Sequence, residues 1–464
     1  MSQFLEFVLG ELRTGLVLVL LAGIFASAAV FVVYQSYKRK YCGQRKFPWK
    51  QTIIWMLFLG YLVIVLYATL MRWYGGYRHW NLHLFRAWRE AWNNFSAKSW
   101  ANVLLNIAMF MPLGFLLPLM GERFRKWYIT IPTAFGASAL IELVQLASNR
   151  GVCDVDDLFC NSLGGMIGYV TVMALGSLVW EKGRGRRGLL AYGALALTPV
   201  VAIGGIFAAY QLREFGNIPE AASHRVNLEH LTWQLECNFP EPEGDMPVFR
   251  TQTMSKDECD AFASRMAAVM GQEVQMVSYY QEMAYYHLSR GIMEVYYHDG
   301  SYELGWFDEE LAHTGQLDRR TVEDALQAFS IRIPAEAEFR REEDGAYSFT
   351  CDEYHDGDTM QDGTLQVLLG ADGSVLWLQN ELISYNHYRD VPVITAQEAF
   401  ERLRKGEFNG AEAVKRDALD AVVVQSCELD YEIDTKGFYQ IVYRFELVLP
   451  DRGYTVSVMI PAME

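Results

Sequence analysis

Six long apolar stretches occupy the first 210 residues of the 464-residue chain. A bilayer core about 30 Å thick is crossed by about 20 apolar residues in an α-helix, and each stretch reaches roughly that length. Five of the stretches contain no charged residue, and the fourth contains one, Glu142. Soluble core helices rarely run so long without charge, so the pattern predicts an all-α membrane bundle of six transmembrane helices. The six windows are residues 15–34, 52–71, 100–120, 127–147, 158–180 and 189–210.

After residue 210 the pattern changes to short amphipathic helices followed by alternating strands. This arrangement occurs three times, over residues 211–315, 316–390 and 391–464. Each repetition predicts a helix laid across an antiparallel sheet. We therefore expect two parts: a transmembrane bundle over residues 1–210, and an α+β domain of helix-plus-antiparallel-sheet units over residues 211–464.

Local signals support this interpretation of the second half. Asp-Gly pairs at 299–300 and 372–373 are typical of hairpin turns, and Thr395 with Glu398 has the spacing of a capping box. The acidic run over residues 338–363 does not have the spacing of a calcium-binding EF-hand, and is interpreted as a solvated hairpin loop. Of the seven cysteines, Cys237 and Cys259 are candidates for one disulfide, with free buried thiols as the alternative.

An aromatic pattern lies between the second and third windows. Phe85, Trp88, Trp92 and Phe95 recur at three- and four-residue steps, which predicts a short helix. Its aromatic face could lie at the membrane interface, or it could pack on the bundle. Both interpretations fit the residues.

Charge changes at the same boundary. Residues 1–210 carry 20 Lys and Arg against 9 Asp and Glu, whereas the remainder carries 20 against 47. Cytoplasmic loops are enriched in Lys and Arg, and placing the N-terminus outside gives 13 such residues in the inner loops and seven in the outer segments. The N-terminus and the acidic domain are then expected outside the plasma membrane. An acidic exterior argues against a nucleic-acid partner, because phosphate binding needs clustered positive charge.

Three of the windows share polar residues that are costly to bury in a bilayer unless each finds a partner. They lie near one end of the third and fourth windows, in the loop that follows, and at the start of the fifth. Under the predicted orientation all face the outer leaflet, so we expect one polar cluster there. Its residues are Asn102, Asn106, Glu142, Gln145, Arg150, Asp154, Asp157 and Asn161, with Ser138 and Asp156 beside them.

These residue types leave three interpretations open. Carboxylate and amide oxygens suit Mg²⁺ or Ca²⁺, which could hold a diphosphate headgroup, although no specific metal motif is present. Glu142 in apolar surroundings could instead transfer a proton. The third interpretation is structural, with Arg150 paired to the aspartates and the amides joining helices. Nearby, the small residues Gly164, Gly165 and Gly168 favour close helix packing.

These segments resemble the motifs of the VanZ-like family. The matching stretches are NVLLNIAMFMPLGFLLP with Asn102 and Asn106, IELVQ with Glu142 and Gln145, and RGVCDVDDLFCNSLGGMIGY from Arg150 onwards. Upstream, RHWNLHLF resembles a further element of the family, with Leu84 where proline is usual. The resemblance covers roughly residues 50–175.

The resemblance implies a bacterial cell-envelope protein. The founding member of the family is associated with low-level resistance to the glycopeptide teicoplanin, and the family names no substrate. In pattern, residues 391–464 are similar to PepSY-like and YycI-like extracytoplasmic modules, which usually bind or inhibit partners. That likeness implies an envelope protein as a partner of the outer domain.

Three functional hypotheses follow. In the first, which is not enzymatic, the cluster binds a membrane lipid, a lipid-linked cell-wall component or an amphiphilic glycopeptide, and the outer domain gates access or recruits a partner. In the second, an enzyme modifies a lipid headgroup with Glu142 or Asp157 as general base. In the third, the outer domain is a sensor, although the longest inner segment, residues 35–51, leaves no room for an output domain.

Overall fold

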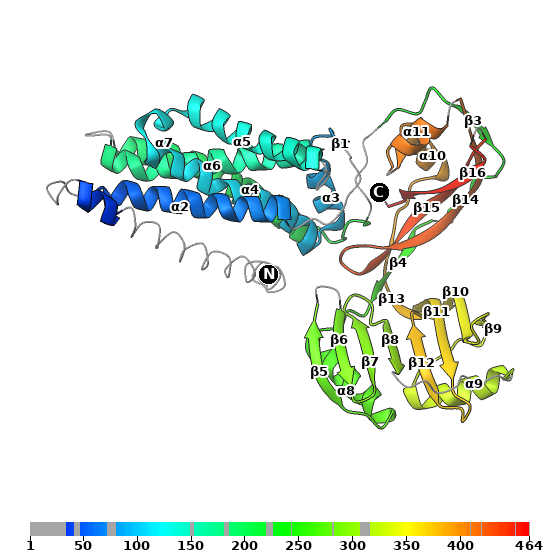
Figure 1. The fold of residues 1–464 in the computed structure, drawn as a ribbon. Helices are drawn as coiled ribbons and strands as arrows, with labels where there is room; N and C mark the ends of the chain where they lie inside the picture. Colours follow the sequence, from blue (N-terminus) through cyan, green and yellow to red (C-terminus); the bar gives the residue numbers. More distant parts are fainter. Residues whose placement is uncertain are drawn as a thin grey trace. The chain divides into compact units, whose positions relative to one another are not determined.

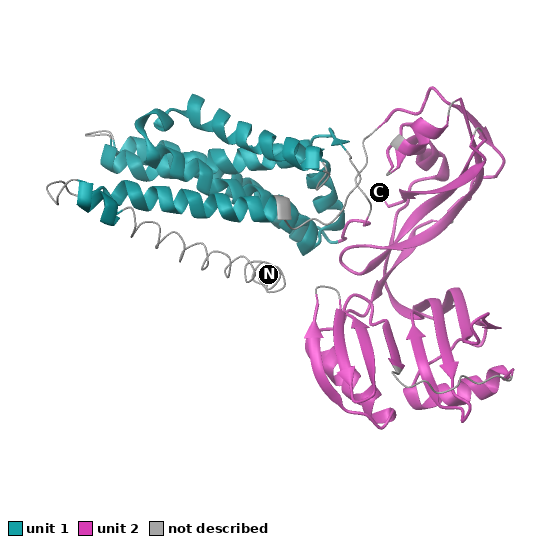
Figure 2. Cartoon of the chain, in the orientation of Figure 1, with its two compact units in different colours: residues 1–214, 220–224 teal, residues 215–219, 225–464 magenta. Residues whose placement is uncertain are grey.

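The computed structural model describes most of the chain, and its parts form two compact units. Unit 1 consists of residues 1–214 and 220–224, and unit 2 of residues 215–219 and 225–464 (Figure 2). The described residues are 34–40, 47–71, 80–148, 153–180, 185–219, 226–242, 244–280, 283–306, 316–408, 410–418, 420–450 and 452–463.

Unit 1 is a helical bundle (Figure 1). Within the described residues, five helices are long and apolar enough to cross a membrane. They coincide with the second to sixth predicted windows, whereas the first window, 15–34, lies outside the described residues except for its last position, so a sixth span is not shown. The elements are α2 Trp49–Leu66 with the π-helical η1 Tyr67–Met71, α4 Ala97–Met120, α5 Trp127–Ser148, α6 Val155–Trp180 and α7 Gly185–Leu212.

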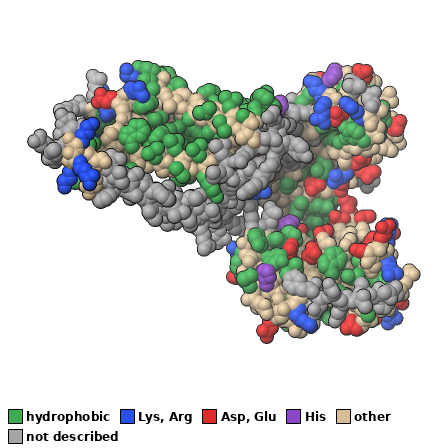
Figure 3. Space-filling view, in the orientation of Figure 1, with side chains coloured by type: hydrophobic (Ala, Val, Ile, Leu, Met, Phe, Trp, Pro, Cys, Tyr) green, Lys and Arg blue, Asp and Glu red, His purple; other side chains and the backbone are tan. Residues whose placement is uncertain are grey.

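The outer faces of these helices are apolar. Leu140 on α5 is 61% exposed and Val201 on α7 is 70% exposed, and hydrophobic side chains cover much of the visible surface of unit 1 (Figure 3). Contiguous apolar surface of this kind is unfavourable in water. The faces are therefore suited to contact with lipid chains.

The two ends of the bundle differ in charge. Lys and Arg side chains gather at one end (Figure 3), where η2 (Glu122–Arg125) joins α4 to α5. There the Arg125 guanidinium lies over the Trp180 ring at 4.3 Å, and the Tyr169 hydroxyl donates to the Arg125 carbonyl at 2.7 Å. The opposite end carries the short strands β1 (Trp80–Asn81) and β2 (Cys153–Asp154) and the helix α3 (Arg86–Asn94).

Helix α3 packs on the bundle. Its Ala91 is fully buried, and the Phe95 ring after its last residue stacks on Tyr210 of α7 with ring centroids 3.4 Å apart. The Trp88 ring meets Trp100 of α4 edge to face at 6.3 Å. Of the two interpretations of the aromatic pattern, the structure therefore supports packing against α4 and α7.

Helices α4 and α6 cross in backbone contact. A Cβ atom added at Gly164 would lie 1.9 Å from the Ile107 carbonyl oxygen, and one at Gly168 would lie 1.9 Å from the Met111 carbonyl oxygen. On α4, a Cβ atom at Gly114 would lie 1.8 Å from the Gly165 carbonyl oxygen. Only glycine permits this approach, and it brings the polar ends of the two helices together.

The described residues of unit 2 form one 14-stranded sheet. Its strand order is β3-β14-β15-β4-β13-β11-β12-β8-β7-β6-β5, while β9, β10 and β16 branch from this path. Its strands are β3 Thr232–Leu235, β4 Met246–Thr251, β5 Val274–Tyr279, β6 Met283–Leu288, β7 Gly291–Tyr296, β8 Tyr302–Trp306, β9 Glu338–Arg341, β10 Tyr347–Asp356, β11 Thr359–Leu369, β12 Val375–Asn380, β13 Ile383–Val391, β14 Ala421–Ile433, β15 Phe438–Leu449 and β16 Tyr454–Pro461. Its helices are α8 Lys256–Val269, α9 Arg319–Leu326 with the 3₁₀ turn η3 Gln327–Phe329, α10 Ala396–Arg404 and α11 Ala411–Asp417.

The expected division of this domain into three helix-plus-sheet units is not confirmed, because strands pair across the expected boundaries. Strand β8 of the first stretch pairs with β12 of the second, and β4 of the first pairs with both β13 and β15. Among the described residues of this unit, the buried apolar side chains form two main cores. Pairing between distant segments merges the three sequence repetitions, because an unpaired strand edge is costly.

Local predictions in unit 2 agree better with the structure. Strands β7 and β8 are antiparallel and their connection contains Gly300 with a positive φ of 75°, and Gly373 between β11 and β12 has a φ of 85°. The capping box of Thr395 and Glu398 is present at the start of α10. Both hairpins and the cap are thus confirmed, because their signals act within a few residues.

The suggested disulfide between Cys237 and Cys259 is wrong. Both cysteines are free. Cys259 belongs to the core beneath α8, whereas Cys237 packs against the other core, beside α10 and β14. Spacing along the chain could not show that two separate cores hold the two thiols.

Candidate functional site: a polar junction of three helices

At the end of the bundle that carries β1 and β2, side-chain carboxylates connect neighbouring segments through hydrogen bonds. The Asn81 side-chain amide donates to Asp154 Oδ2 at 2.9 Å, while β1 and β2 pair in parallel. Asp156 is buried and accepts from the backbone N–H groups of Phe85 and Ala87, at 2.5 and 2.7 Å. Asp156 thus fixes the first turn of α3, whose N-cap residue Phe85 has a positive φ of 66° and supplies no side-chain cap.

Glu142 lies deeper, on α5, and is only 4% exposed. Its Oε2 atom accepts from the Asp154 N–H at 3.0 Å, and Asp154 Oδ1 accepts from the Asp156 N–H at 2.8 Å. Both oxygens of Asp154 and both oxygens of Asp156 therefore have donors. Within the described part of the chain, no hydrogen bond reaches the second oxygen of Glu142.

Two amides connect α6 to its neighbours. The Asn106 side-chain amide on α4 donates to Asp157 Oδ1 at 2.5 Å, and the Asn161 amide donates to the Ser138 hydroxyl of α5 at 3.0 Å. Asn161 is 2% exposed, and its Oδ1 atom is buried without a hydrogen-bond partner. Buried acceptors are normally satisfied, so this atom marks an incomplete network.

The spacing of these residues places them on two successive turns. Ser138 and Glu142 are four residues apart on α5, and Asp157 and Asn161 are four residues apart on α6, so each pair shares a helix face. Since Ser138 bonds Asn161, Glu142 and Asp157 occupy the adjacent turn. We call Asn106, Ser138, Glu142, Asp154, Asp157 and Asn161 the polar junction.

Two other residues predicted for the cluster, Gln145 and Asn102, lie outside this hydrogen-bond network. Gln145 donates to the Thr69 carbonyl at 2.9 Å and so ties α5 to η1. Asn102 is exposed on α4, one turn before Asn106. Arg150 lies outside the described residues.

Some contacts could not be found from the sequence. The acceptor of Gln145 is a backbone carbonyl and the donors to Asp156 are backbone N–H groups, which leave no residue-type signal. Asn81 had one signal, its place in the RHWNLHLF stretch, but no pattern indicated its bond to Asp154.

The junction is strongly acidic. Its three carboxylates and the neighbouring Asp156 form no ion pair within the described residues, and across those ranges no three His, Cys, Asp or Glu side chains are close enough to hold one metal ion. At the edge of the junction, outside the helices, burial and the nearby Glu142 and Asp154 carboxylates raise the pKa of the Cys153 thiol. The site is therefore an arrangement of hydrogen-bond acceptors with negative charge.

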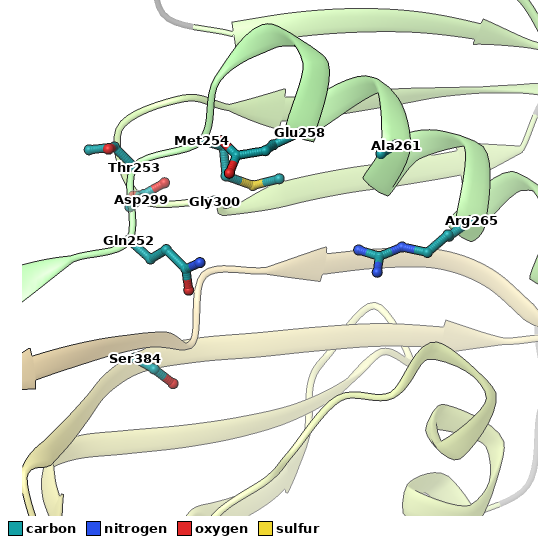
Figure 4. Close-up of a pocket in the computed structure, with 9 residues that line it drawn as sticks. All are labelled: Gln252, Thr253, Met254, Glu258, Ala261, Arg265, Asp299, Gly300 and Ser384. Atoms are coloured by element: carbon teal, nitrogen blue, oxygen red, sulfur yellow. The ribbon is translucent and has the colours of Figure 1, made fainter.

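Unit 2 has an open groove of its own, of about 590 Å³. In Figure 4 Arg265 lies at one end and Asp299 near the other. The carboxylates of the groove already serve local structure, since Glu258 completes the capping box of α8 and Asp299 accepts from Ser301. The lining residues are Gln252, Thr253, Met254, Glu258, Ala261, Arg265, Asp299, Gly300 and Ser384. The polar junction, with an unfilled buried acceptor, is the stronger candidate site.

An apolar bundle with a polar junction at one end defines a multi-pass membrane protein. Residues 54–176 match the model of the VanZ/LLP1 family, and this segment contains every residue of the polar junction. The match covers about a quarter of the chain, and the similarity supports a VanZ-like, multi-pass membrane protein of the cell envelope. The comparison with curated proteins gives no match.

Proposed function

We propose that the polar junction binds the headgroup of a lipid-linked or amphiphilic component of the cell envelope at the outer leaflet. The observation that carries the proposal is the set of acceptors left over inside the bundle. Glu142, Asp157 and Asn161 each retain an oxygen to which no donor within the described residues bonds. Unfilled acceptors and unpaired carboxylates in an apolar bundle cost several kcal/mol, and a bound headgroup offsets that cost.

The distribution of charge supports the outer leaflet as the place of binding. Lys and Arg gather at the end of the bundle opposite β1, β2 and α3. Positive loops favour the cytoplasmic side, so the junction is expected to face outward. The same orientation puts the C-terminal domain outside the cell, where it gates access to the junction or recruits an envelope protein.

Teicoplanin susceptibility tests this proposal in cells. A deletion strain is complemented with wild type, with Glu142→Gln or with Asp157→Asn. We expect wild type to restore the resistance level and the two variants to fail, because each replaces an unfilled acceptor with a donor. Glu122→Gln is the matched control, since Glu122 is exposed at the opposite end of the bundle. Full rescue by the two junction variants, at wild-type protein levels, would show that the junction has no part in this function.

A further inference from the structure

The polar junction retains hydrogen-bond acceptors after its own bonds are formed. The Asn106 and Asn161 amides each donate once, to Asp157 and Ser138, and the Asp154 N–H donates to Glu142. Among the described residues, no donor bonds one oxygen each of Glu142 and Asp157, or the buried Oδ1 atom of Asn161. A ligand that bonds these three oxygens must bring donors.

The ligand must also bring positive charge. Two carboxylates, Glu142 and Asp157, lie on facing turns of α5 and α6, and Asp154 lies beside them. Like charges on neighbouring side chains repel strongly in an apolar medium. An anionic phosphate or carboxylate placed there would add to the repulsion.

The requirement for several directed donors distinguishes a nitrogen cation from a metal ion. Across the described ranges no three carboxylate, imidazole or thiol side chains are close enough to share one metal. An ammonium group has three N–H donors and no acceptor, which matches the three unfilled oxygens in number and in kind. A trimethylammonium group has the same charge and none of these donors.

Resting on the proposed function, we propose that the headgroup held by the junction is a primary ammonium, donating to Glu142, Asp157 and the Oδ1 atom of Asn161. The membrane source of such a group is an aminolipid such as phosphatidylethanolamine, and the soluble source is a free amine. The lipid places its ammonium at the headgroup depth expected for an outer-leaflet site. The acidic junction thus selects the amine end of a headgroup over its phosphate.

The test compares two lipids that differ only in their N–H donors. Full-length protein is reconstituted in discs containing either phosphatidylethanolamine or phosphatidylcholine, and retained lipid is counted by native mass spectrometry. We expect wild type to retain the ethanolamine lipid about tenfold more tightly, the ratio that 1.4 kcal/mol of charge-assisted hydrogen bonding gives. Free ethanolamine is added in a parallel experiment, and competition by ethanolamine at low millimolar concentration would assign the site to a soluble amine.

Two isosteric variants make the test specific. In Glu142→Gln the amide oxygen can still accept from the Asp154 N–H, and in Asp157→Asn the oxygen can still accept from the Asn106 amide, but the free oxygen of each becomes an N–H₂ donor. Both variants are expected to retain the two lipids equally, whereas Glu122→Gln keeps the tenfold ratio. Asn161→Ala provides a third variant that leaves both carboxylates in place.

Equal retention of the two lipids by wild type overturns the ammonium assignment. It leaves the proposed function standing if Glu142→Gln and Asp157→Asn still fail to restore teicoplanin resistance. If the ratio is absent and Arg150→Gln lowers the thermal midpoint as much as Asp157→Asn does, the cation in the junction belongs to the chain itself, and the assignment is again wrong.

Discussion

The crossing of α4 and α6 allows a sharp prediction for Gly164→Ala. The new methyl carbon would lie 1.9 Å from the Ile107 carbonyl oxygen, against 3.4 Å or more for an ordinary contact. The obstructing atom belongs to the helix backbone, so no side chain can turn away. The two helices must separate by roughly 1.5 Å at this point, the shortfall of that contact, and overpacking of this kind costs about 1–3 kcal/mol.

The separation also reaches the polar junction. Ile107 directly follows Asn106, and Gly164 lies two helical turns after Asp157, so the Asn106–Asp157 hydrogen bond depends on the same crossing. Weakening a hydrogen bond to a charged group adds about 1.5–3 kcal/mol. Because part of this hydrogen bond survives by relaxation, the two costs do not add in full, and we expect a total loss of roughly 2–4 kcal/mol. That loss corresponds to a fall in the thermal midpoint of roughly 5–15 °C.

The assay is thermal unfolding of the full-length protein in detergent, with Gly136→Ala as the matched control. Gly136 is also in the interior of a transmembrane helix, α5, but a Cβ atom there meets nothing within 4 Å. Alanine is a better helix former than glycine by about 1 kcal/mol, so Gly136→Ala should be neutral or stabilising. Equal midpoints for Gly164→Ala and Gly136→Ala would contradict backbone contact between α4 and α6.

Three further predictions concern other parts of the molecule. Asp156→Ala removes both acceptors that hold the first turn of α3 and should lower the midpoint by an amount equivalent to about 1–2 kcal/mol, while faster hydrogen exchange confined to α3 would identify the cause. Burial and the Asp430 carboxylate raise the pKa of Glu353 to about 7 from 4.5. Because the pKa is higher in the folded state, protonation of Glu353 favours folding; this contribution to stability is complete below about pH 4.5 and is lost as the pH rises through 7. Unit 2 should therefore unfold at a lower temperature at pH 8 than at pH 5, by an amount equivalent to about 1–2 kcal/mol after allowing for partial exposure, and Glu353→Gln should remove most of that difference. Gly363→Ala should destabilise unit 2 by about 2 kcal/mol or more, as measured by calorimetry, because φ is 112° and a Cβ atom would lie 2.1 Å from the Glu381 carbonyl oxygen.

The long apolar helices could be predicted from the sequence, as could the local hairpins, whereas the long-range pairing of strands in the sheet could not. An apolar window such as 100–120 identifies α4 by itself, because helix hydrogen bonds are local and a bilayer demands length. The pairing of β8 with β12 joins residues about 75 positions apart, and that of β4 with β15 joins residues about 190 apart. The alternation of apolar and polar residues shows which face of a strand is buried, but it does not show which strand pairs with it.

The candidate site divides in a similar way. Glu142, Asp157 and Asn161 could be grouped in advance, since each is polar at a helix position where polarity is costly. Asn102 belongs to the same pattern, yet its side chain is exposed. A repeat of one helical turn does not show which of its residues contact the neighbouring helices. The attachment of α3 through Asp156 rests on backbone donors, which no residue pattern reveals.

The composition of the lipids that co-purify with the full-length protein tests most directly whether the polar junction binds a headgroup. Wild type, the Glu122→Gln control and a Glu142→Gln/Asp157→Asn double variant are extracted from the same membranes, and bound lipid is quantified per mole of protein. We expect one class of headgroup to be enriched over the bulk membrane in wild type and in the control, and to return to the bulk proportion in the double variant. The same lipid composition in all three proteins would contradict a headgroup site in the polar junction.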